Sequence, residues 1–218
     1  LNNLQANADQ NSCSNTLKNE DIKKIISRGK SNGMFVSGWE QDDEGIREKD
    51  MNDVVEQLLT AAENNDITQM QTLLSENPAL IKAHDADGYT ALHRAAYNNH
   101  VESLKFLLSS GADAEACTED GWTALHSASN WACYEAVGIL LSHGVNVNCC
   151  TKGNLTPLHL AITSQENVER AFHTVRYLLQ APGINPCVLS NAGETPVMLA
   201  RRAPPQILEI LDEYLKRR

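Results

Sequence analysis

The sequence predicts an all-α solenoid with turn or β-hairpin tips, built from three full repeats between degenerate N- and C-terminal caps. Residues 85–117 and 118–150 align without a gap, and each segment carries the motif Thr-Ala-Leu-His, a later Leu-Leu pair and a closing glycine. A related motif, Thr-Pro-Leu-His, keeps the register, because His159 follows His126 by the same 33 residues that separate His126 from His93. Repeated matches in one register indicate stacked copies of one supersecondary unit.

Each full repeat is expected to contain a turn and two helices. In the first full repeat, the turn falls at Asp87-Gly88, and Thr90 is placed to cap a short helix through its hydroxyl group. The second helix starts at Val101 and carries apolar residues at helical spacing. Gly111 ends this helix, because glycine readily adopts the left-handed conformation that follows a helix.

The two ends and the third full repeat depart from this pattern. Residues 52–84 predict a degenerate first repeat, in which Asp66 caps the second helix. Five extra residues at about 164–171 interrupt the period, since a Leu-Leu pair comes 38 rather than 33 residues after its counterpart. We expect these residues to lie in a loop or to lengthen a helix. A last degenerate repeat begins near Leu189 and ends in a helix that starts at Gln206.

Residues 1–50 do not resemble the repeats. The expected organisation is therefore a mostly disordered, acidic and polar N-terminal arm, followed by a repeat domain over residues 51–218. Within the arm, Thr16–Arg28 has the spacing of an amphipathic helix. Residues 34–39 include apolar side chains beside an acidic run, and an alternative interpretation is a short linear motif.

Charge is concentrated in the repeats. The net charge is −10, and residues 51–200 contain six Lys and Arg against sixteen Asp and Glu. An acidic body repels phosphates, so direct binding of nucleic acid is disfavoured, and a protein partner with a basic or neutral surface fits better. Alternatively, the charge serves only solubility. No apolar run of about 18 residues occurs, so we expect no membrane-spanning segment.

The residues that could carry chemistry predict no catalytic site, no cofactor and no metal. Six cysteines occur without a zinc-like spacing, so we expect reduced thiols in an intracellular protein. His93, His126 and His159 recur with the repeat, but helices that stack about 8–10 Å apart hold them too far apart to share a zinc ion with ligands at about 2 Å. We therefore expect each imidazole to be structural and to bond near the threonine of its own repeat.

The Thr-Ala-Leu-His, Thr-Pro-Leu-His and Gly-Ala-Asp motifs resemble those of the ankyrin-repeat family, and the similarity extends from Asn52 to Arg218. The resemblance implies an ankyrin-repeat solenoid without enzyme activity, which acts as a protein-binding adaptor in the nucleus or the cytoplasm and is connected with the regulation of gene expression. We expect a monomer. Two other functions stay open: a nucleic-acid-associated regulator, and a scaffold that acts mainly through residues 1–50.

In this family the variable positions lie on the hairpin tips and at the end of each first helix, where they form a concave binding surface. In this chain they are Asp87, Tyr89, Tyr97 and Asn98 in one repeat, Glu119, Asp120, Trp122, Asn130 and Trp131 in the next, and Leu155 and Gln165 in the third. Tryptophan and tyrosine are frequent interface hot spots. We therefore expect the four aromatic residues to contact a partner; the alternative is that Tyr89 or Trp122 packs against the next hairpin.

Overall fold

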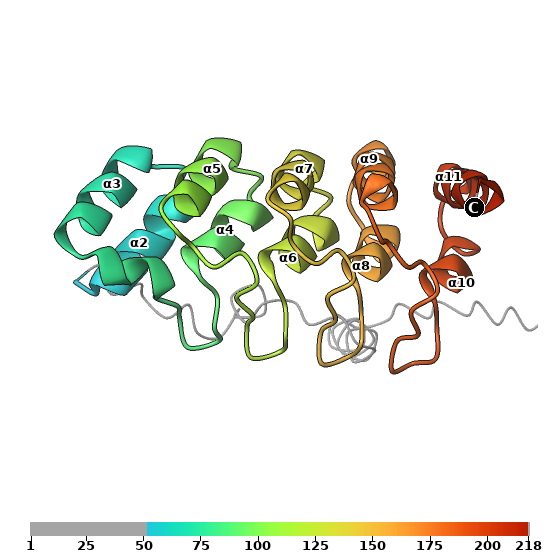
Figure 1. Ribbon diagram of the computed structural model, residues 1–218, viewed down its shortest axis with the longest axis horizontal. Helices are drawn as coiled ribbons and strands as arrows, with labels where there is room; N and C mark the ends of the chain where they lie inside the picture. Colours follow the sequence, from blue (N-terminus) through green and yellow to red (C-terminus); the bar gives the residue numbers. More distant parts are fainter. Residues whose placement is uncertain (1–51, 218) are drawn as a thin grey trace, which may run out of the picture. The chain divides into compact units, whose positions relative to one another are not determined.

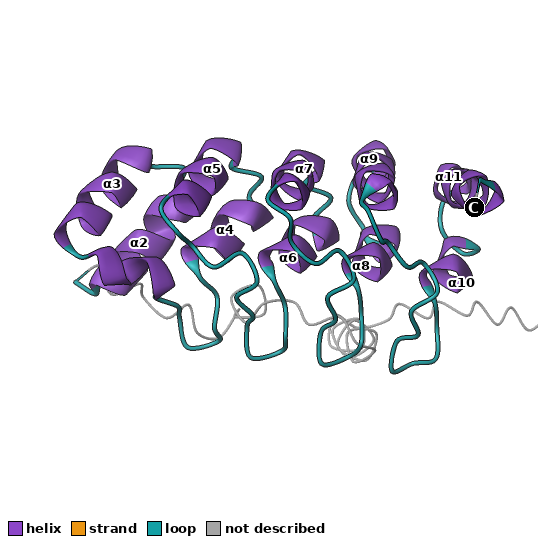
Figure 2. Cartoon of the chain, viewed as in Figure 1, coloured by secondary structure: helices purple, strands orange, loops and turns teal. Residues whose placement is uncertain are grey.

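The computed structural model describes residues 52–217, which form ten α-helices and one 3-10 helix, with no strand in this part of the chain (Figure 2). The helices are α2 (Val54–Glu63), α3 (Ile67–Glu76), η2 (Pro78–Lys82), α4 (Ala91–Tyr97), α5 (Val101–Ser109), α6 (Ala124–Asn130), α7 (Tyr134–Ser142), α8 (Pro157–Thr163), α9 (Val168–Gln180), α10 (Pro196–Ala200) and α11 (Pro205–Lys216). The predicted arm, its helix at Thr16–Arg28 and its motif at 34–39 lie outside the described residues. None of the described helices is long and apolar enough to cross a membrane.

Five helix pairs stack side by side, which confirms the predicted repeat solenoid (Figure 1). α2, α4, α6, α8 and α10 form an inner layer, and α3, α5, α7, α9 and α11 form an outer layer. Each inner helix packs against the inner helices beside it and against the outer helix of its own pair. Contacts therefore join neighbouring repeats, as in other solenoids.

Capping residues precede the helices at the predicted positions, although the predicted hydroxyl of Thr90 contacts His93 Nδ1 at 2.9 Å rather than the backbone of α4. The hydroxyl groups of Thr123, Thr156 and Thr195 each accept a hydrogen bond from the third backbone N–H of α6, α8 and α10. In the first repeat, Asp66 Oδ1 accepts from the Gln69 N–H at 2.9 Å, so that α3 begins at the next residue. A side-chain acceptor at this position satisfies one of the backbone donors that a helix leaves unpaired at its start.

The core is a row of equivalent leucines. Leu92, Leu125 and Leu158 lie 33 residues apart on the inner helices and are almost fully buried, and Leu107 and Leu140 occupy the matching place in the outer layer. Burying each leucine contributes about 1.5–3 kcal/mol. The apolar periodicity of the sequence thus corresponds to the contact between the two layers.

The five inserted residues lengthen one outer helix. α9 has 13 residues where α5 and α7 have nine, which accounts for four of the five. The fifth lies in the connection Ser164–Asn167, since the equivalent connections at 98–100 and 131–133 are one residue shorter. The predicted location is confirmed, and the consequence is an extra turn at the start of α9.

Backbone hydrogen bonds connect each tip to the next one. The Glu119 N–H donates to the Asp87 carbonyl at 2.9 Å, and the Lys152 N–H donates to the Asp120 carbonyl at the same distance. The tips are turns rather than extended hairpins, and among the described residues an isolated antiparallel bridge occurs between 84 and 90. The row of tips is therefore fixed by main-chain bonds that do not depend on side-chain identity.

The turn glycines are required by this close approach. Gly88 has a φ of 88°, and a Cβ atom added to it would lie 2.9 Å from the Thr118 Cα atom of the next tip. Gly121 has a φ of 79°, and its Cβ atom would lie 3.1 Å from the Lys152 nitrogen. Positive φ and contact with a neighbouring backbone both favour glycine.

Three histidines link each repeat to the following one. The Thr123 N–H donates to His126 Nδ1 at 3.1 Å, so the ring proton is on Nε2, which donates to the Leu155 carbonyl at 3.1 Å. The same two bonds are made by His93, to Thr90 and Trp122, and by His159, to Thr156 and Glu194. The predicted bond to the threonine is confirmed, and the bond to the next tip is a contact that the sequence did not predict.

Burial keeps these imidazoles neutral. Removal from water lowers the pKa of His93 and of His126 to about 4, although each ring donates to a backbone carbonyl that favours the protonated form. Burial also lowers the pKa of His159. A neutral ring is needed in this position, because Nδ1 must accept a hydrogen bond while Nε2 donates one.

An ion cluster connects the N-terminal repeat to the first full repeat. Arg94 on α4 contacts Glu56 at 3.0 Å and Glu63 at 3.3 Å, both on α2, and Asp85 at 3.1 Å at the base of the first tip. The Arg94 side chain is only 7% exposed. A guanidinium group has five donors in a fixed plane, so one arginine can serve several carboxylates. This contact was not predicted, because the equivalent position in the next repeat is Ser127.

Replacing His126 with alanine is expected to lower the free energy of unfolding by about 1–3 kcal/mol, because two buried backbone groups lose a hydrogen-bond partner. Urea unfolding followed by circular dichroism measures this change. His143→Ala is the matched control, since His143 is exposed at the end of α7 and its replacement should cost less than about 0.5 kcal/mol. An equal loss in both variants would contradict the linking role.

The buried histidines also predict acid sensitivity. His93 has a folded-state pKa of about 4, below the value of 6.5 of a free histidine, so the unfolded chain binds the proton more readily. Its stabilising contribution is complete above pH 6.5 and is lost as the pH falls toward 4. Between pH 7 and pH 5 we expect a loss of about 2 kcal/mol from this residue. Unfolding free energies measured at both pH values should show a smaller difference for His93→Ala than for the natural sequence; identical differences would refute the assignment.

Candidate partner-binding surface

The predicted partner-binding residues lie at two levels of the inner layer. We use the term inner face for the tips at 85–89, 118–122, 151–155 and 190–194 together with the C-terminal ends of α4, α6 and α8. The tips project below the inner helices (Figure 1). α4 and α6 each have seven residues, so a length of about 10 Å separates a tip from the far end of its helix.

Tyr97 and Trp131 come together at the far end of α4 and α6. Their rings meet edge to face, with centroids 5.0 Å apart and an interplanar angle of 88°. Both side chains are half-buried, and Trp131 packs against the core on one side. The Cys133 thiol donates to the Tyr97 carbonyl at 3.2 Å, which holds the two helix ends together. Two large aromatic rings from adjacent repeats thus form one feature of the surface.

Trp122 does not line the surface as predicted, because the structure buries it to 8% exposure. Its ring lies 6.3 Å from the His126 ring, and its carbonyl accepts hydrogen bonds from both the Thr118 N–H and His93 Nε2. The residue therefore packs within the row of tips, as the alternative interpretation had it. A tryptophan at a variable position of the repeat can thus be buried in the stack instead of lining the binding surface.

Tyr89 has an intermediate position. It is half-buried, and its ring meets His93 edge to face at 5.7 Å. The other tip residues are more polar: Asp87 and Glu119 are exposed, and Asp120 is half-buried. Their backbones are joined in the row of tips, whereas their side chains carry negative charge at the surface.

The remaining predicted residues are spread along the inner face. Asn98 ends α4, and its side-chain amide donates to the Arg94 carbonyl at 3.1 Å. Asn130 is half-buried at the end of α6, and the half-buried Leu155 contributes its carbonyl to His126. Gln165 is exposed in the connection before α9. The sequence predicted one concave surface for all of these residues. The structure places some of them at the tips, some at the ends of α4 and α6, and the others in the third full repeat.

The cysteines near this surface are poor nucleophiles. Cys149 lies 3.7 Å from His126 Nδ1, but burial raises the pKa of its thiol to about 12, and burial raises that of Cys133 to about 12 as well. The reactive form of cysteine is the thiolate. The five cysteines within residues 52–217 are free thiols, and the same residues contain no group of three or more His, Cys, Asp or Glu that could hold a metal ion.

Comparison with known proteins agrees with this architecture. A family model described as ankyrin repeats in three copies matches residues 58–151, and one described as an ankyrin repeat matches residues 153–191. Ankyrin repeat domain-containing protein 49 of Drosophila melanogaster is 38% identical over 95 residues, which are 42% of this chain and 44% of that protein. The protein of the same name from Bos taurus is 45% identical over 80 residues, which are 37% of this chain and 32% of that protein.

The matched segments cover only part of this chain and part of each relative. The chain spans less than half the length of the curated relatives it matches. A similarity to the human NAD-capped RNA hydrolase NUDT12 covers 28% of this chain and 13% of that protein, so it carries no argument for hydrolase activity. The two family matches together cover more than half of the 218 residues. The helix pairs, the linked tips and these matches show that the chain belongs to the ankyrin-repeat family.

Proposed function

We propose that this protein is a non-enzymatic adaptor that binds a protein partner through its inner face. Ankyrin repeats generally serve as protein-interaction modules, and the proposal assigns that role to a defined surface of this chain. The observation that supports it most directly is the edge-to-face pair of Tyr97 and Trp131, which keeps two rings partly accessible on adjacent repeats. Aromatic residues that are fixed in this way lose little conformational freedom on binding and are enriched among interface hot spots.

The charge of the inner face suggests the chemistry of the partner. The first two full tips present Asp87, Glu119 and Asp120, and the third tip presents Lys152. We propose that the partner places a basic or neutral surface against the first two repeats, because opposite charges steer association and like charges oppose it. The protein would bind as a monomer, and direct contact with nucleic acid is disfavoured by the same carboxylates.

A connection with gene expression is supported by the family resemblance alone. We propose it together with a nuclear or cytoplasmic location, and fluorescence microscopy of the tagged chain tests the location. Recovery of transcription-associated proteins by affinity purification and mass spectrometry would support the connection. Recovery of cytoskeletal or membrane proteins alone would count against it.

Two tryptophan variants test the use of the inner face. Trp131→Ala should weaken the recovered partner at least tenfold, because truncating a hot-spot tryptophan costs about 2 kcal/mol or more. Its effect on folding should be smaller than that of a fully buried tryptophan, about 1.5–3 kcal/mol, because the half-buried ring loses its contact with the core as well as the pair with Tyr97. Titration of the partner and a thermal melt of the same sample measure both effects.

Trp122→Ala makes the same chemical change at a buried position and is the matched control. It should lower the free energy of unfolding by about 3–5 kcal/mol, whereas the fraction that remains folded should bind the partner normally. Undiminished binding by Trp131→Ala would remove the support for the inner face as the binding surface.

A further inference from the structure

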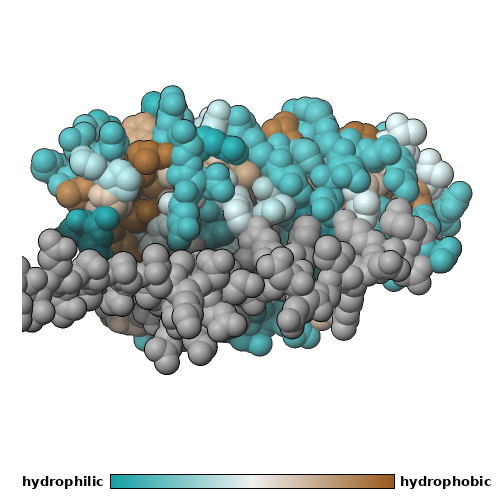
Figure 3. Space-filling model, turned by 180° about the vertical axis from the view of Figure 1, so that it is seen from behind, coloured by the Kyte–Doolittle hydropathy of each residue, from teal (hydrophilic) through white to brown (hydrophobic). Residues whose placement is uncertain are grey.

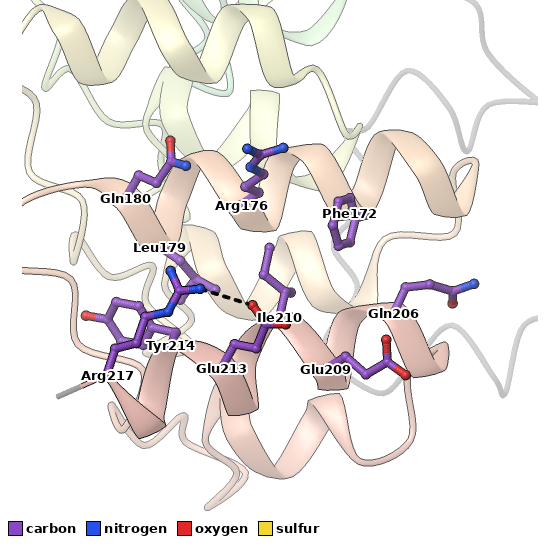
Figure 4. A pocket seen from close by; sticks show the side chains of 10 residues that line it. All are labelled: Phe172, Arg176, Leu179, Gln180, Gln206, Glu209, Ile210, Glu213, Tyr214 and Arg217. Carbon is purple, nitrogen blue, oxygen red and sulfur yellow. Dashed lines mark hydrogen bonds and ion pairs between the residues drawn. The ribbon is translucent and has the colours of Figure 1, made fainter.

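The last two outer helices enclose a groove that the proposed function does not use. The groove has a volume of about 380 Å³ and lies between α9 and α11 (Figure 4). A second hollow of about 490 Å³ continues it toward the start of α9, since both are lined by Phe172 and Gln206. In the view from behind, apolar surface interrupts a mostly hydrophilic face toward the end that carries the last repeat (Figure 3).

The groove has an apolar floor. Phe172 and Leu179 point from α9 toward Ile210 and Tyr214 on α11 (Figure 4). Val168 extends this floor at one end and is 42% exposed. The apolar floor residues of α9 run from Val168 to Leu179, a length of about 16 Å, which corresponds to about three helical turns. An apolar strip of this length matches the stripe of an amphipathic helix.

Two charged side chains of opposite sign flank the apolar floor of the groove. Arg176 lies on the α9 rim and Glu209 on the α11 rim, on opposite sides of the floor (Figure 4). Neither side chain forms an ion pair with any residue between 52 and 217. Glu213, also on the α11 rim, contacts Arg217 at 3.5 Å, and both of these side chains are exposed. Arg176 and Glu209 thus leave one positive and one negative charge available along the groove, and Glu169 of α9 adds a carboxylate beside Val168 in the adjoining hollow.

The irregularity of the repeat creates part of this groove. Val168 belongs to the extra turn that the insertion adds to α9, and it lies where α5 and α7 have no equivalent turn. α11 is also long, with 12 residues. The stacking of repeats does not require either extension. The insertion thereby adds an exposed apolar residue next to Phe172 and enlarges the continuous apolar floor of the groove, and a continuous exposed apolar surface marks a contact site.

We propose that the groove between α9 and α11 binds an amphipathic helix of a partner protein, whose apolar stripe is flanked by acidic residues on one side and by basic residues on the other. The apolar stripe would cover Val168, Phe172 and Ile210. The acidic flank would face Arg176, and the basic flank would face Glu209. This surface lies on the outer layer, so it does not overlap the inner face.

Three synthetic helical peptides test the proposal on the full chain. They share leucines at positions i, i+3, i+4 and i+7, and their flanks carry Glu on one side and Lys on the other, Lys on both sides, or Glu on both sides. Fluorescence anisotropy measures each Kd. The Glu/Lys peptide should bind about three- to tenfold more tightly than the other two. Its helix can lie in the groove in two directions, and in one of them its Glu flank faces Arg176 while its Lys flank faces Glu209.

Charge reversal of the protein provides the decisive comparison. Arg176→Glu makes both rims acidic, so the preferred peptide should become the one with Lys on both sides. Lys216→Glu, on α11 but outside the groove lining, is the matched control and should leave the ranking unchanged. An unchanged ranking with Arg176→Glu would overturn the proposal.

A second variant tests the apolar floor. Val168→Asp should weaken the Glu/Lys peptide about tenfold without lowering the melting temperature, because the side chain is exposed and an acidic residue suits the start of a helix. Failure of all three peptides to bind would overturn the proposal. The proposal would also be overturned if analytical ultracentrifugation detected a dimer that the Val168→Asp variant does not form. A second copy of the chain would then occupy the groove.

Discussion

The stack depends on one hydrogen-bond relay that recurs in each full repeat. A threonine starts the inner helix, a neutral histidine accepts from the threonine N–H, and the same ring donates to a carbonyl of the next tip. The ring must be neutral, because only the neutral form can accept at Nδ1 and donate at Nε2. Its burial enforces this state and keeps water from competing for the carbonyl. The tips are thereby fixed relative to the helices, and the inner face inherits its shape from them.

Aromatic residues at variable positions of one repeat differ in how far the fold buries them. Trp122 and Trp131 both occupy variable positions of one repeat. Trp122 supplies the carbonyl on which the ring of His93 and a tip N–H converge, and its side chain is buried to 8% exposure with its ring 6.3 Å from that of His126. Trp131 lies beyond the end of α6, where no repeat contact uses its backbone in this way, and its ring pairs with Tyr97 instead. Leu155 and Glu194 hold the same place in the relay and are half-buried, so the packing of the side chain, rather than its position in the relay, decides which aromatic residue stays accessible.

The two ends of the described chain depart from the regular repeat in different ways. At the N-terminal end, Arg94 replaces a small polar residue and gathers three carboxylates from α2 and the first tip, which fastens the degenerate repeat to the regular ones. Toward the C-terminal end, an insertion lengthens α9 and leaves a groove against α11. A solenoid tolerates both changes, because each repeat contacts only its neighbours and a local change does not propagate.

The sequence by itself determined the period, the helix pairs, the capping threonines, the turn glycines and the place of the insertion. These features follow from short-range rules, since caps, turns and apolar stripes are encoded within a few residues of one another. Only the tertiary structure decided that His126 bonds to Leu155, that Tyr97 meets Trp131 and that Trp122 is buried. The first two of these contacts join residues of adjacent repeats, about one period apart in the chain. The repeat pattern shows that the two segments stack, but the direction in which a side chain points across the interface is settled by packing.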